Sequence, residues 1–195
     1  MEKTLILASA SPRRRQLLEQ IRIPFQVLVS EAEEIWHGTR PEEIVKELAL
    51  LKAKAAANKF SQETGGEALL LGADTVVVRD GEILGKPEDE KDAYEMLHSL
   101  QGRSHQVFTG VALLEIEKSG QKIRFLHAEE TKVFVHAMTP EEIWDYVRTG
   151  EPMDKAGAYG IQGSFAAYID RIEGDYFNVV GLPLACVYQN LKSWL

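Results

Sequence analysis

The chain has 195 residues, 45% of them hydrophobic and 27% charged, a composition typical of a globular protein with a substantial core. Its formal net charge of −8 argues against a nucleic-acid-binding surface, which is usually basic. The single cysteine, Cys186, excludes an internal disulfide framework, and its apolar neighbours indicate a small core residue. No apolar run approaches the ~20 residues that span a bilayer. We therefore expect a cytoplasmic protein that binds neither nucleic acid nor membrane.

A short apolar strand over residues 4–8 leads into a predicted helix with Ser11 as its N-cap and Pro12 as its first residue. The arginines that follow, Arg13 to Arg15, oppose the helix dipole, which favours acidic residues in a first turn. Such departures from local rules are expected at functional sites. Free N–H groups and guanidinium forks at a helix start suit phosphate. We predict an anion site here and expect one of the arginines to be merely solvated.

Residues 24–29 predict a second strand, and a loop with the acids Glu31, Glu33 and Glu34 follows it. Carboxylates in a loop are most often solvated, but this cluster could supply a ligand to a metal ion.

A long helix is predicted to begin near Thr39. Its apolar residues recur at helical spacing: Ile44, Leu48, Leu51 and Ala55. Lys52 and Lys54 flank this stripe, and lysines at the edge of a buried face usually extend to water.

Residues 69–78 place three leucines and three valines around a single carboxylate, Asp74. Their length, their β-branched content and the Asp80-Gly81 turn that follows favour a buried strand. An ionised aspartate in dry surroundings costs several kcal/mol unless it is paired. Either Asp74 points into solvent where the strand bends at Gly72, or it is a metal ligand or general base held on a rigid strand.

The remaining elements are predicted in this order: a return strand over 82–84, a helix over 89–100, long strands over 105–116 and 123–135, a helix opened by a Thr139–Glu142 capping box, and a final helix from about residue 183. Loops dominate the last third, where Glu151, Asp154 and Lys155 lie close together and glycines flank Gln162. The alternation of strands and helices predicts an α/β fold with a mixed sheet, in one domain over residues 1–195.

Two motifs that would indicate other kinds of active site are absent from the sequence. No pair of its five histidines has the spacing of a zinc site, and no Gly-x-Ser-x-Gly nucleophile motif is present. What remains is a set of cations suited to an oligophosphate and of oxygen ligands suited to Mg²⁺ or Mn²⁺. These residues point to metal-assisted phosphoanhydride chemistry on a phosphorylated small molecule.

Several short segments carry a shared pattern: Ser-Ala-Ser-Pro-Arg-Arg at 9–14, Gly-Ala-Asp-Thr at 72–75, Gly-Lys-Pro at 85–87, Thr-Gly-Glu at 149–151, Asp-Lys-Ala-Gly at 154–157, Tyr-Gly-Ile-Gln-Gly at 159–163, Gly-Asp-Tyr at 174–176 and Asn-Val-Val-Gly-Leu-Pro at 178–183. Together they closely resemble the Maf family of nucleoside triphosphate pyrophosphatases, also called septum formation inhibitors. The resemblance implies hydrolysis of a nucleoside triphosphate to the monophosphate and pyrophosphate with a divalent cation. It also implies an elongated mixed sheet flanked by helices, in two lobes with a central cleft, similar to inosine triphosphate pyrophosphatases.

The resemblance also assigns roles to residues of this sequence. It implies that Asp74 is the proton acceptor. The residues implied to bind substrate are Ser9, Arg13, Arg14, Lys52, Thr75, Lys86, Lys155 and Gln162, and those implied to hold Mg²⁺ or Mn²⁺ are Glu33, Asp74 and Asp154. Glu31 and Glu34 stay open as alternatives to Glu33, and Lys54 as an alternative to Lys52.

The combination of Arg13, Thr75 and Gln162 resembles the subgroup that hydrolyses dTTP and UTP, rather than the one that acts on 7-methyl-GTP. The amide of Gln162 can both donate to and accept from a pyrimidine edge. Modified pyrimidine nucleotides are a further substrate class, and a homodimer is usual for the family. Two alternatives stay open: a nucleotide-sensing regulator that halts division through a protein partner, and a phosphatase that removes only the terminal phosphate.

Overall fold

The computed structural model describes residues 3–29 and 35–194. Its helices are α1 (Pro12–Gln20), α2 (Pro41–Thr64), α3 (Glu90–Leu100), α4 (Pro140–Arg148), α5 (Tyr176–Val180) and α6 (Leu184–Leu191), with short 3-10 turns at Glu151–Asp154, Ala156–Ala158 and Ser164–Tyr168. Its strands are β1 (Thr4–Leu7), β2 (Gln26–Val27), β3 (Ala68–Arg79), β4 (Glu82–Leu84), β5 (Ser104–Glu117), β6 (Gly120–Val135) and β7 (Ile169–Glu173). None of the described helices combines the length and the apolar character needed to cross a membrane.

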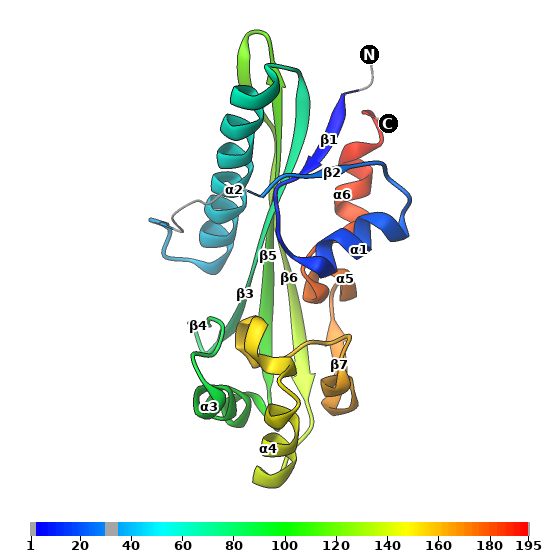
Figure 1. Cartoon of the computed structure of the whole chain (residues 1–195). Coiled ribbons are helices and arrows are strands. Elements are labelled where there is room, and N and C mark those ends of the chain that lie inside the picture. The colour runs from blue at the N-terminus through cyan, green and yellow to red at the C-terminus, as the bar shows by residue number, and fades with distance from the viewer. Residues whose placement is uncertain (1–2, 30–34, 195) are drawn as a thin grey trace. The chain divides into compact units, whose positions relative to one another are not determined.

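Within the described residues the strands form a seven-stranded sheet in the order β2-β1-β3-β5-β6-β7, with β4 paired to β3. β1 is parallel to both β2 and β3. β4 is antiparallel to β3, and β7 is antiparallel to β6. The predicted mixed sheet flanked by helices is therefore confirmed (Figure 1). The chain divides into two compact units: Met1–Asp74, Thr109–Glu129 and Gly181–Leu195 form the first, and Thr75–Phe108 and Glu130–Val180 form the second.

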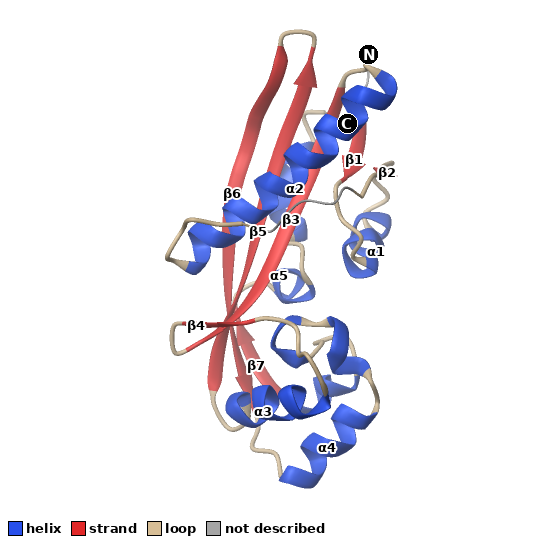
Figure 2. Ribbon diagram, turned by 60° about the vertical axis from the view of Figure 1, so that its left-hand side comes forward, coloured by secondary structure: helices blue, strands red, loops and turns tan. Residues whose placement is uncertain are grey.

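In the first unit, α2 packs against β3 and β5 at unusually short range (Figure 2). A Cβ atom at Gly72 of β3 would lie 2.1 Å from the carbonyl oxygen of Ala49, and one at Gly110 of β5 would lie 2.0 Å from that of Val45. The helix presents the small side chains of Ala49 and Ala53 to these strands. Because both partners lack bulk there, the helix backbone lies almost directly on the sheet.

The buried stripe of α2 differs from the predicted one. Ile44 and Leu48 are buried, but Leu51 and Ala55 are only half-buried. The fully buried face also includes the small residues Val45, Ala49, Ala53, Ala56 and Ala57. The sequence pattern gave too much weight to large side chains, whereas the close approach to glycine favours alanine on the contact face.

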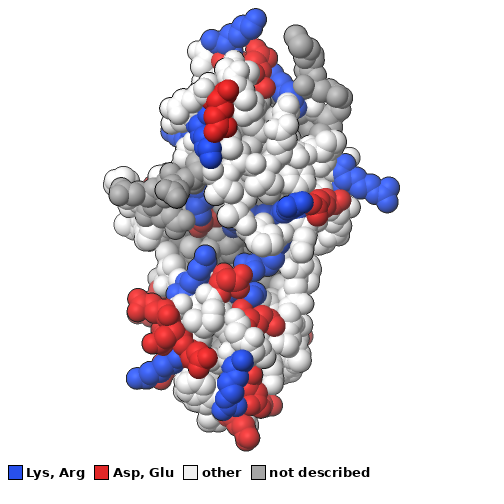
Figure 3. Space-filling view, viewed as in Figure 1, with Lys and Arg blue, Asp and Glu red and all other residues white. Residues whose placement is uncertain are grey.

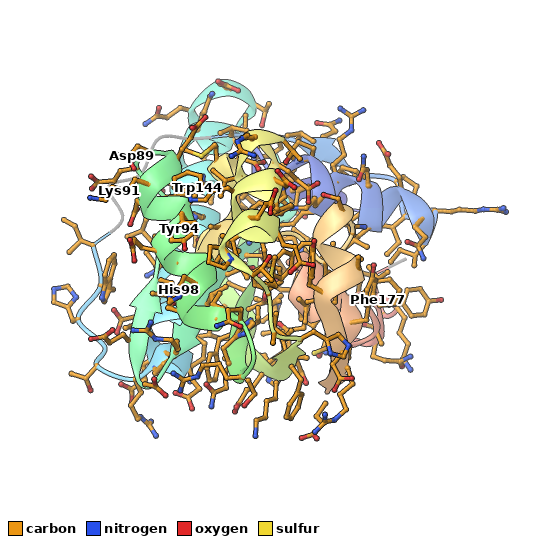
Figure 4. All side chains as sticks on the ribbon, turned by 90° about the horizontal axis from the view of Figure 1, so that it is seen from below. Asp89, Lys91, Tyr94, His98, Trp144 and Phe177 are labelled. Carbon is orange, nitrogen blue, oxygen red and sulfur yellow. The ribbon has the colours of Figure 1, made fainter. Side chains whose placement is uncertain are left out.

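In the second unit, α3 and α4 pack on a core that includes Leu97, Ile143 and Phe165. Figure 4 shows Tyr94 and His98 of α3 in a row with Trp144 of α4. The rings of Tyr94 and Trp144 are stacked with centroids 4.7 Å apart. The predicted boundaries of these helices are confirmed, because Asp89 caps α3 and the Thr139 capping box opens α4.

The last third is more regular than the predicted loops. Residues 169–173 form β7, which pairs with β6, and residues 176–180 form the short helix α5. Neither segment is long enough to show a hydrophobic period, so β7 depends on its partner strand for recognition. At the other end of the chain, the strand predicted over 24–29 is only the two residues of β2. Cys186 is half-buried on α6 rather than fully in the core.

Candidate active site

Asp74 lies on β3 and is only 8% exposed. Its Oδ1 atom accepts a hydrogen bond from the Lys52 ammonium, and the two side chains form an ion pair. The interpretation that Asp74 points into solvent is therefore wrong. A buried carboxylate on a strand that is paired with a lysine is both electrostatically satisfied and held in a defined direction.

The packing of α2 on β3 explains why Lys52 is the partner. Lys52 follows Ala49 by three residues, so it lies on the face of α2 that touches Gly72. Lys54 lies about 200° further round the helix axis and is exposed. Of the two lysines that the sequence left open, Lys52 is the one beside Asp74.

A second group of candidate residues lies at the start of α1. The Ser11 hydroxyl caps the helix by accepting from the backbone N–H of Arg14, as predicted. The guanidinium of Arg14, 9% exposed, donates from Nε to the carbonyl oxygen of Gly181 over 2.7 Å and from a terminal nitrogen to the Ser9 hydroxyl over 3.2 Å. Arg14 thus ties the first helix to the segment before α6, a contact that no local pattern indicates.

The neighbouring arginines differ in their surroundings. Arg13 is half-buried, whereas Arg15 is exposed and pairs with Glu19 one turn along the helix. Arg15 is therefore the solvated member of the triplet, as expected for one of the three. The Ser-Pro turn and α1 position Ser9, Arg13 and Arg14 together in the first unit.

In the second unit, two predicted cations come from segments that are hydrogen-bonded to each other. The Gly157 N–H donates to the carbonyl oxygen of Gly85 over 2.9 Å, which joins the segment of Lys155 to that of Lys86. Lys86 is exposed. Lys155 donates to the carbonyl oxygen of Glu151 over 2.6 Å and to the Asp154 carboxylate over 2.7 Å.

Gln162 is exposed in a tight turn, in which the Gly163 N–H donates to the Gly160 carbonyl oxygen over 3.2 Å. Its amide is therefore available for a ligand on a short, closed loop. Thr75 is half-buried on β3, directly after Asp74.

A hydrogen-bond network that no sequence pattern predicts supports this turn. Glu151 accepts from the Tyr146 hydroxyl over 2.9 Å and from the backbone N–H and hydroxyl of Ser164 over 3.1 Å and 3.0 Å. Burial opposes ionisation of Glu151, but the hydrogen bonds from Ser164 and Tyr146 outweigh it and lower the pKa of the carboxyl group. Tyr146 lies on α4 before Glu151 and Ser164 lies in the 3-10 turn after it, and no recurrent local motif has this spacing, so only the fold identifies these contacts.

Acidic side chains gather over α3 on the face shown in Figure 3. They line a surface depression of about 410 Å³ formed by Glu88, Asp89, Lys91, Asp92 and Glu95. A triphosphate would meet like charges there, so this depression is unsuited to it.

The chain was compared with families of known proteins. The family model for Maf-like proteins matches residues 4–194. The chain belongs to the Maf family.

Relatives within this family are similar over nearly their whole length. The dTTP/UTP pyrophosphatase of Geobacillus sp. (strain WCH70) is 53% identical over 191 residues, which cover 97% of each chain. The dTTP/UTP pyrophosphatase of Symbiobacterium thermophilum is 54% identical, over 97% of this chain and 93% of the relative. Among solved structures, the Staphylococcus aureus Ham1 protein aligns with a TM-score of 0.41 and 14% identity, over 68% of this chain and 72% of that one.

The resemblance to the Maf family implies a divalent metal ion, and its predicted ligands within the described residues, Asp74 and Asp154, are carboxylates, which suit Mg²⁺ or Mn²⁺. Among the described side chains, no group of three or more His, Cys, Asp and Glu residues is arranged to hold a metal ion. Mg²⁺, however, commonly binds to proteins through one or two carboxylates and completes its shell with water and substrate phosphates. Asp74 is a buried carboxylate of this kind. Glu33, with its alternatives Glu31 and Glu34, lies outside the described residues.

Proposed function

We propose that this Maf-family chain hydrolyses dTTP and UTP to the monophosphate and pyrophosphate. The observation that carries the proposal is the buried pair of Asp74 and Lys52, which puts a base and a cation together on rigid elements. Substrate choice is supported by relatives that are 53% and 54% identical and are named dTTP/UTP pyrophosphatases. Modified pyrimidine triphosphates belong to the same proposal, in a role of clearing the nucleotide pool.

Asp74 acts as the general base in this mechanism. Its carboxylate takes a proton from the water that attacks the α-phosphorus in line, and pyrophosphate leaves with the electron pair of the broken P–O bond. Lys52 keeps the carboxylate in one orientation, because its ammonium is hydrogen-bonded to one carboxylate oxygen. Lys52 lies on α2 and Asp74 on β3, and these two elements are in close contact at Gly72. The two side chains therefore need to move little during the reaction.

Cationic side chains stabilise the charge that develops on the phosphates. We assign this role to Arg13, Arg14, Lys86 and Lys155, with Ser9 as a hydroxyl ligand. Arg14 donates to Ser9 and Gly181 already, so its guanidinium is pre-oriented. The exposed amide of Gln162, together with Thr75, reads the pyrimidine edge.

A divalent cation, Mg²⁺ or Mn²⁺, would be held by Asp74 with Glu33 and Asp154. When bound, it supplies Lewis-acid stabilisation of phosphate charge. We further propose that the enzyme works as a cytoplasmic homodimer. Light scattering on the purified protein tests the dimer, and removal of divalent ions with EDTA tests the metal requirement.

Product analysis tests the function directly. dTTP, UTP, CTP, GTP, ATP and 7-methyl-GTP are offered in parallel with Mg²⁺ or Mn²⁺. We expect monophosphate and pyrophosphate, formed fastest from dTTP and UTP. Orthophosphate as the product would instead support removal of the terminal phosphate, and tight binding without turnover would support a nucleotide sensor.

A further inference from the structure

The turn that carries Gln162 is attached at both ends to one pair of side chains. At its start, the Gly160 N–H donates to the Tyr146 hydroxyl over 3.3 Å. At its end, the backbone N–H and hydroxyl of Ser164 donate to the Glu151 carboxylate. The Tyr146 hydroxyl in turn donates to the other carboxylate oxygen of Glu151. The Tyr146–Glu151 pair therefore closes a frame around the turn.

The carboxylate of Glu151 lies directly against the backbone of the turn. A Cβ atom at Gly163 would lie 1.8 Å from Glu151 Oε1 and 2.6 Å from Oε2. Position 163 therefore has room only for glycine while the carboxylate occupies its place. The glycine and the glutamate form one packed unit, with Gln162 as the side chain that projects beside it.

The frame rests on the core of the second unit. Tyr146 is 4% exposed on α4, and its ring packs on Phe165 with centroids 5.0 Å apart. Tyr159, just before the turn, is bonded through its hydroxyl to Nε2 of the buried His105 over 2.7 Å. These anchors leave the short turn with little freedom, so the direction of Gln162 is set by the side chains beneath it.

Glu151 is hydrogen-bonded to the neighbouring cation, Lys155, through its backbone. Lys155 donates to the backbone carbonyl oxygen of Glu151, not to its carboxylate. A substitution of the Glu151 side chain leaves that hydrogen bond in place, although it removes the attraction between the carboxylate and the Lys155 charge. An effect through Lys155 on phosphate binding should be the same for every nucleotide, whereas an effect through the Gln162 turn should depend on the base.

We propose that Glu151 is a positioning residue that sets the base preference of the enzyme by holding the Gln162 turn through Tyr146 and Ser164. This inference rests on the proposed function, in which Gln162 reads the pyrimidine. It predicts that loss of the carboxylate changes which nucleotide is preferred more than it changes the rate of hydrolysis.

The test uses Glu151→Gln in the full chain, with kcat and KM measured for dTTP, UTP and CTP. The amide has one acceptor oxygen in place of two and cannot keep the hydrogen bonds from both Tyr146 and Ser164. We therefore expect the preference for dTTP over CTP to fall about tenfold, the size of one hydrogen bond to a charged group. kcat for dTTP should change less than this ratio. Asp145→Asn is the matched control, because Asp145 is an exposed carboxylate of α4 bonded to Arg148.

Two further variants keep the test decisive if Glu151→Gln fails to fold. Tyr146→Phe and Ser164→Ala each remove one hydroxyl of the frame, and both should shift the preference in the same direction. Tyr168→Phe is the control for Tyr146→Phe, since its ring also packs on Phe165. The effects of Glu151→Gln and Tyr146→Phe should be less than additive, because both break one network.

The outcomes separate this inference from the function on which it rests. If the wild-type chain releases pyrophosphate from dTTP but the folded frame variants keep the wild-type preference, the role of Glu151 is overturned and the function stands. If the wild-type chain releases no pyrophosphate, the proposed function fails. Calorimetric titration with dTTP and CTP then reports the base preference of the wild-type and variant chains without turnover, and an unchanged preference again overturns the inference.

Discussion

At Asp74 a single carboxylate has to stay charged inside an apolar strand. Lys52 meets that requirement by pairing with it, at a site where water is largely excluded. The same pairing points the carboxylate in one direction, which a general base needs. The contact between Lys52 and Asp74 therefore both compensates the buried charge and orients the base for catalysis.

Replacing Asp74 by Asn should abolish most of the activity and keep the fold. The amide is nearly the same size but cannot accept a proton from water, so turnover of dTTP should fall about a hundredfold or more. Pyrophosphate release measures this. Asp80→Asn is the control, because Asp80 is an exposed acid in the turn after the same strand. Near-normal turnover in Asp74→Asn would contradict the assignment of the base.

Replacing Lys52 by Met should destabilise the protein through Asp74. The buried carboxylate loses its partner, and we expect the free energy of unfolding to fall by about 2 kcal/mol, measured by urea denaturation. The double variant Lys52→Met with Asp74→Asn should recover part of this loss, since no unpaired charge remains. Lys54→Met, at an exposed position, should have little effect. Equal stability of the Lys52 and Lys54 variants would speak against the pair.

At the scale of elements, the position of α2 is decided by two glycines, one on β3 and one on β5, which have no side chains to hold the helix away. Gly72 and Gly110 leave open the space that the backbone of α2 occupies. Figure 1 shows α2 on one side of these strands and α1 and α6 on the other. Both faces of β3 are covered, which explains why most of this strand is buried and apolar on successive residues rather than alternating.

Gly72→Ala should therefore destabilise the protein although the added group is only a methyl. It would lie 2.1 Å from a backbone carbonyl oxygen, and such overpacking costs roughly 1–3 kcal/mol. The midpoint of denaturation measures the change. Gly85→Ala is the control, because a Cβ atom there meets nothing within 4 Å. A Gly72 variant as stable as the Gly85 variant would show that α2 can move away freely.

At the scale of the whole molecule, an ionic cluster ties the chain ends into the first unit. The buried Glu115 of β5 pairs with Lys3 and Arg124. Both cations also lie over the Trp194 ring, with Lys3 Nζ 5.7 Å and the Arg124 guanidinium carbon 5.5 Å from its centroid. Opposite charges and a tryptophan face thus hold together residues that are far apart in sequence.

The stability of the molecule should depend on pH through His105. Burial lowers its pKa from the usual 6.5 to about 4, so the folded chain keeps it neutral while the unfolded chain binds a proton below pH 6.5. Stability should therefore fall as the pH drops from 6.5 towards 4, by roughly 3 kcal/mol in total from this group.

Urea denaturation at several pH values between 6.5 and 4 measures this dependence. His105→Gln removes the titrating group, so its stability should fall less steeply with decreasing pH than that of the wild type, by about 1.4 kcal/mol per pH unit. The slope is informative even if the variant is less stable at every pH. Identical slopes in His105→Gln and wild type would contradict a buried neutral histidine.

Local rules determined much of this protein from its sequence. The Ser11 cap, the Thr139 capping box and the β3–β4 turn were all predicted correctly, because each depends on contacts within a few residues. The motifs that indicate the Maf family are likewise short and contiguous. Two unusual placements of charge also indicated the candidate site from the sequence: a lone acid in an apolar strand and arginines in the first turn of a helix.

Only the tertiary structure decided the partners of those residues. The choice of Lys52 over Lys54 depends on how closely α2 approaches β3. Arg14 finds its acceptor at Gly181, and Glu151 finds its donor at Ser164. These contacts join segments that the sequence keeps apart. Burial makes the contacts of Asp74 and Arg14 necessary, because a polar group removed from water must be satisfied wherever the fold provides a partner.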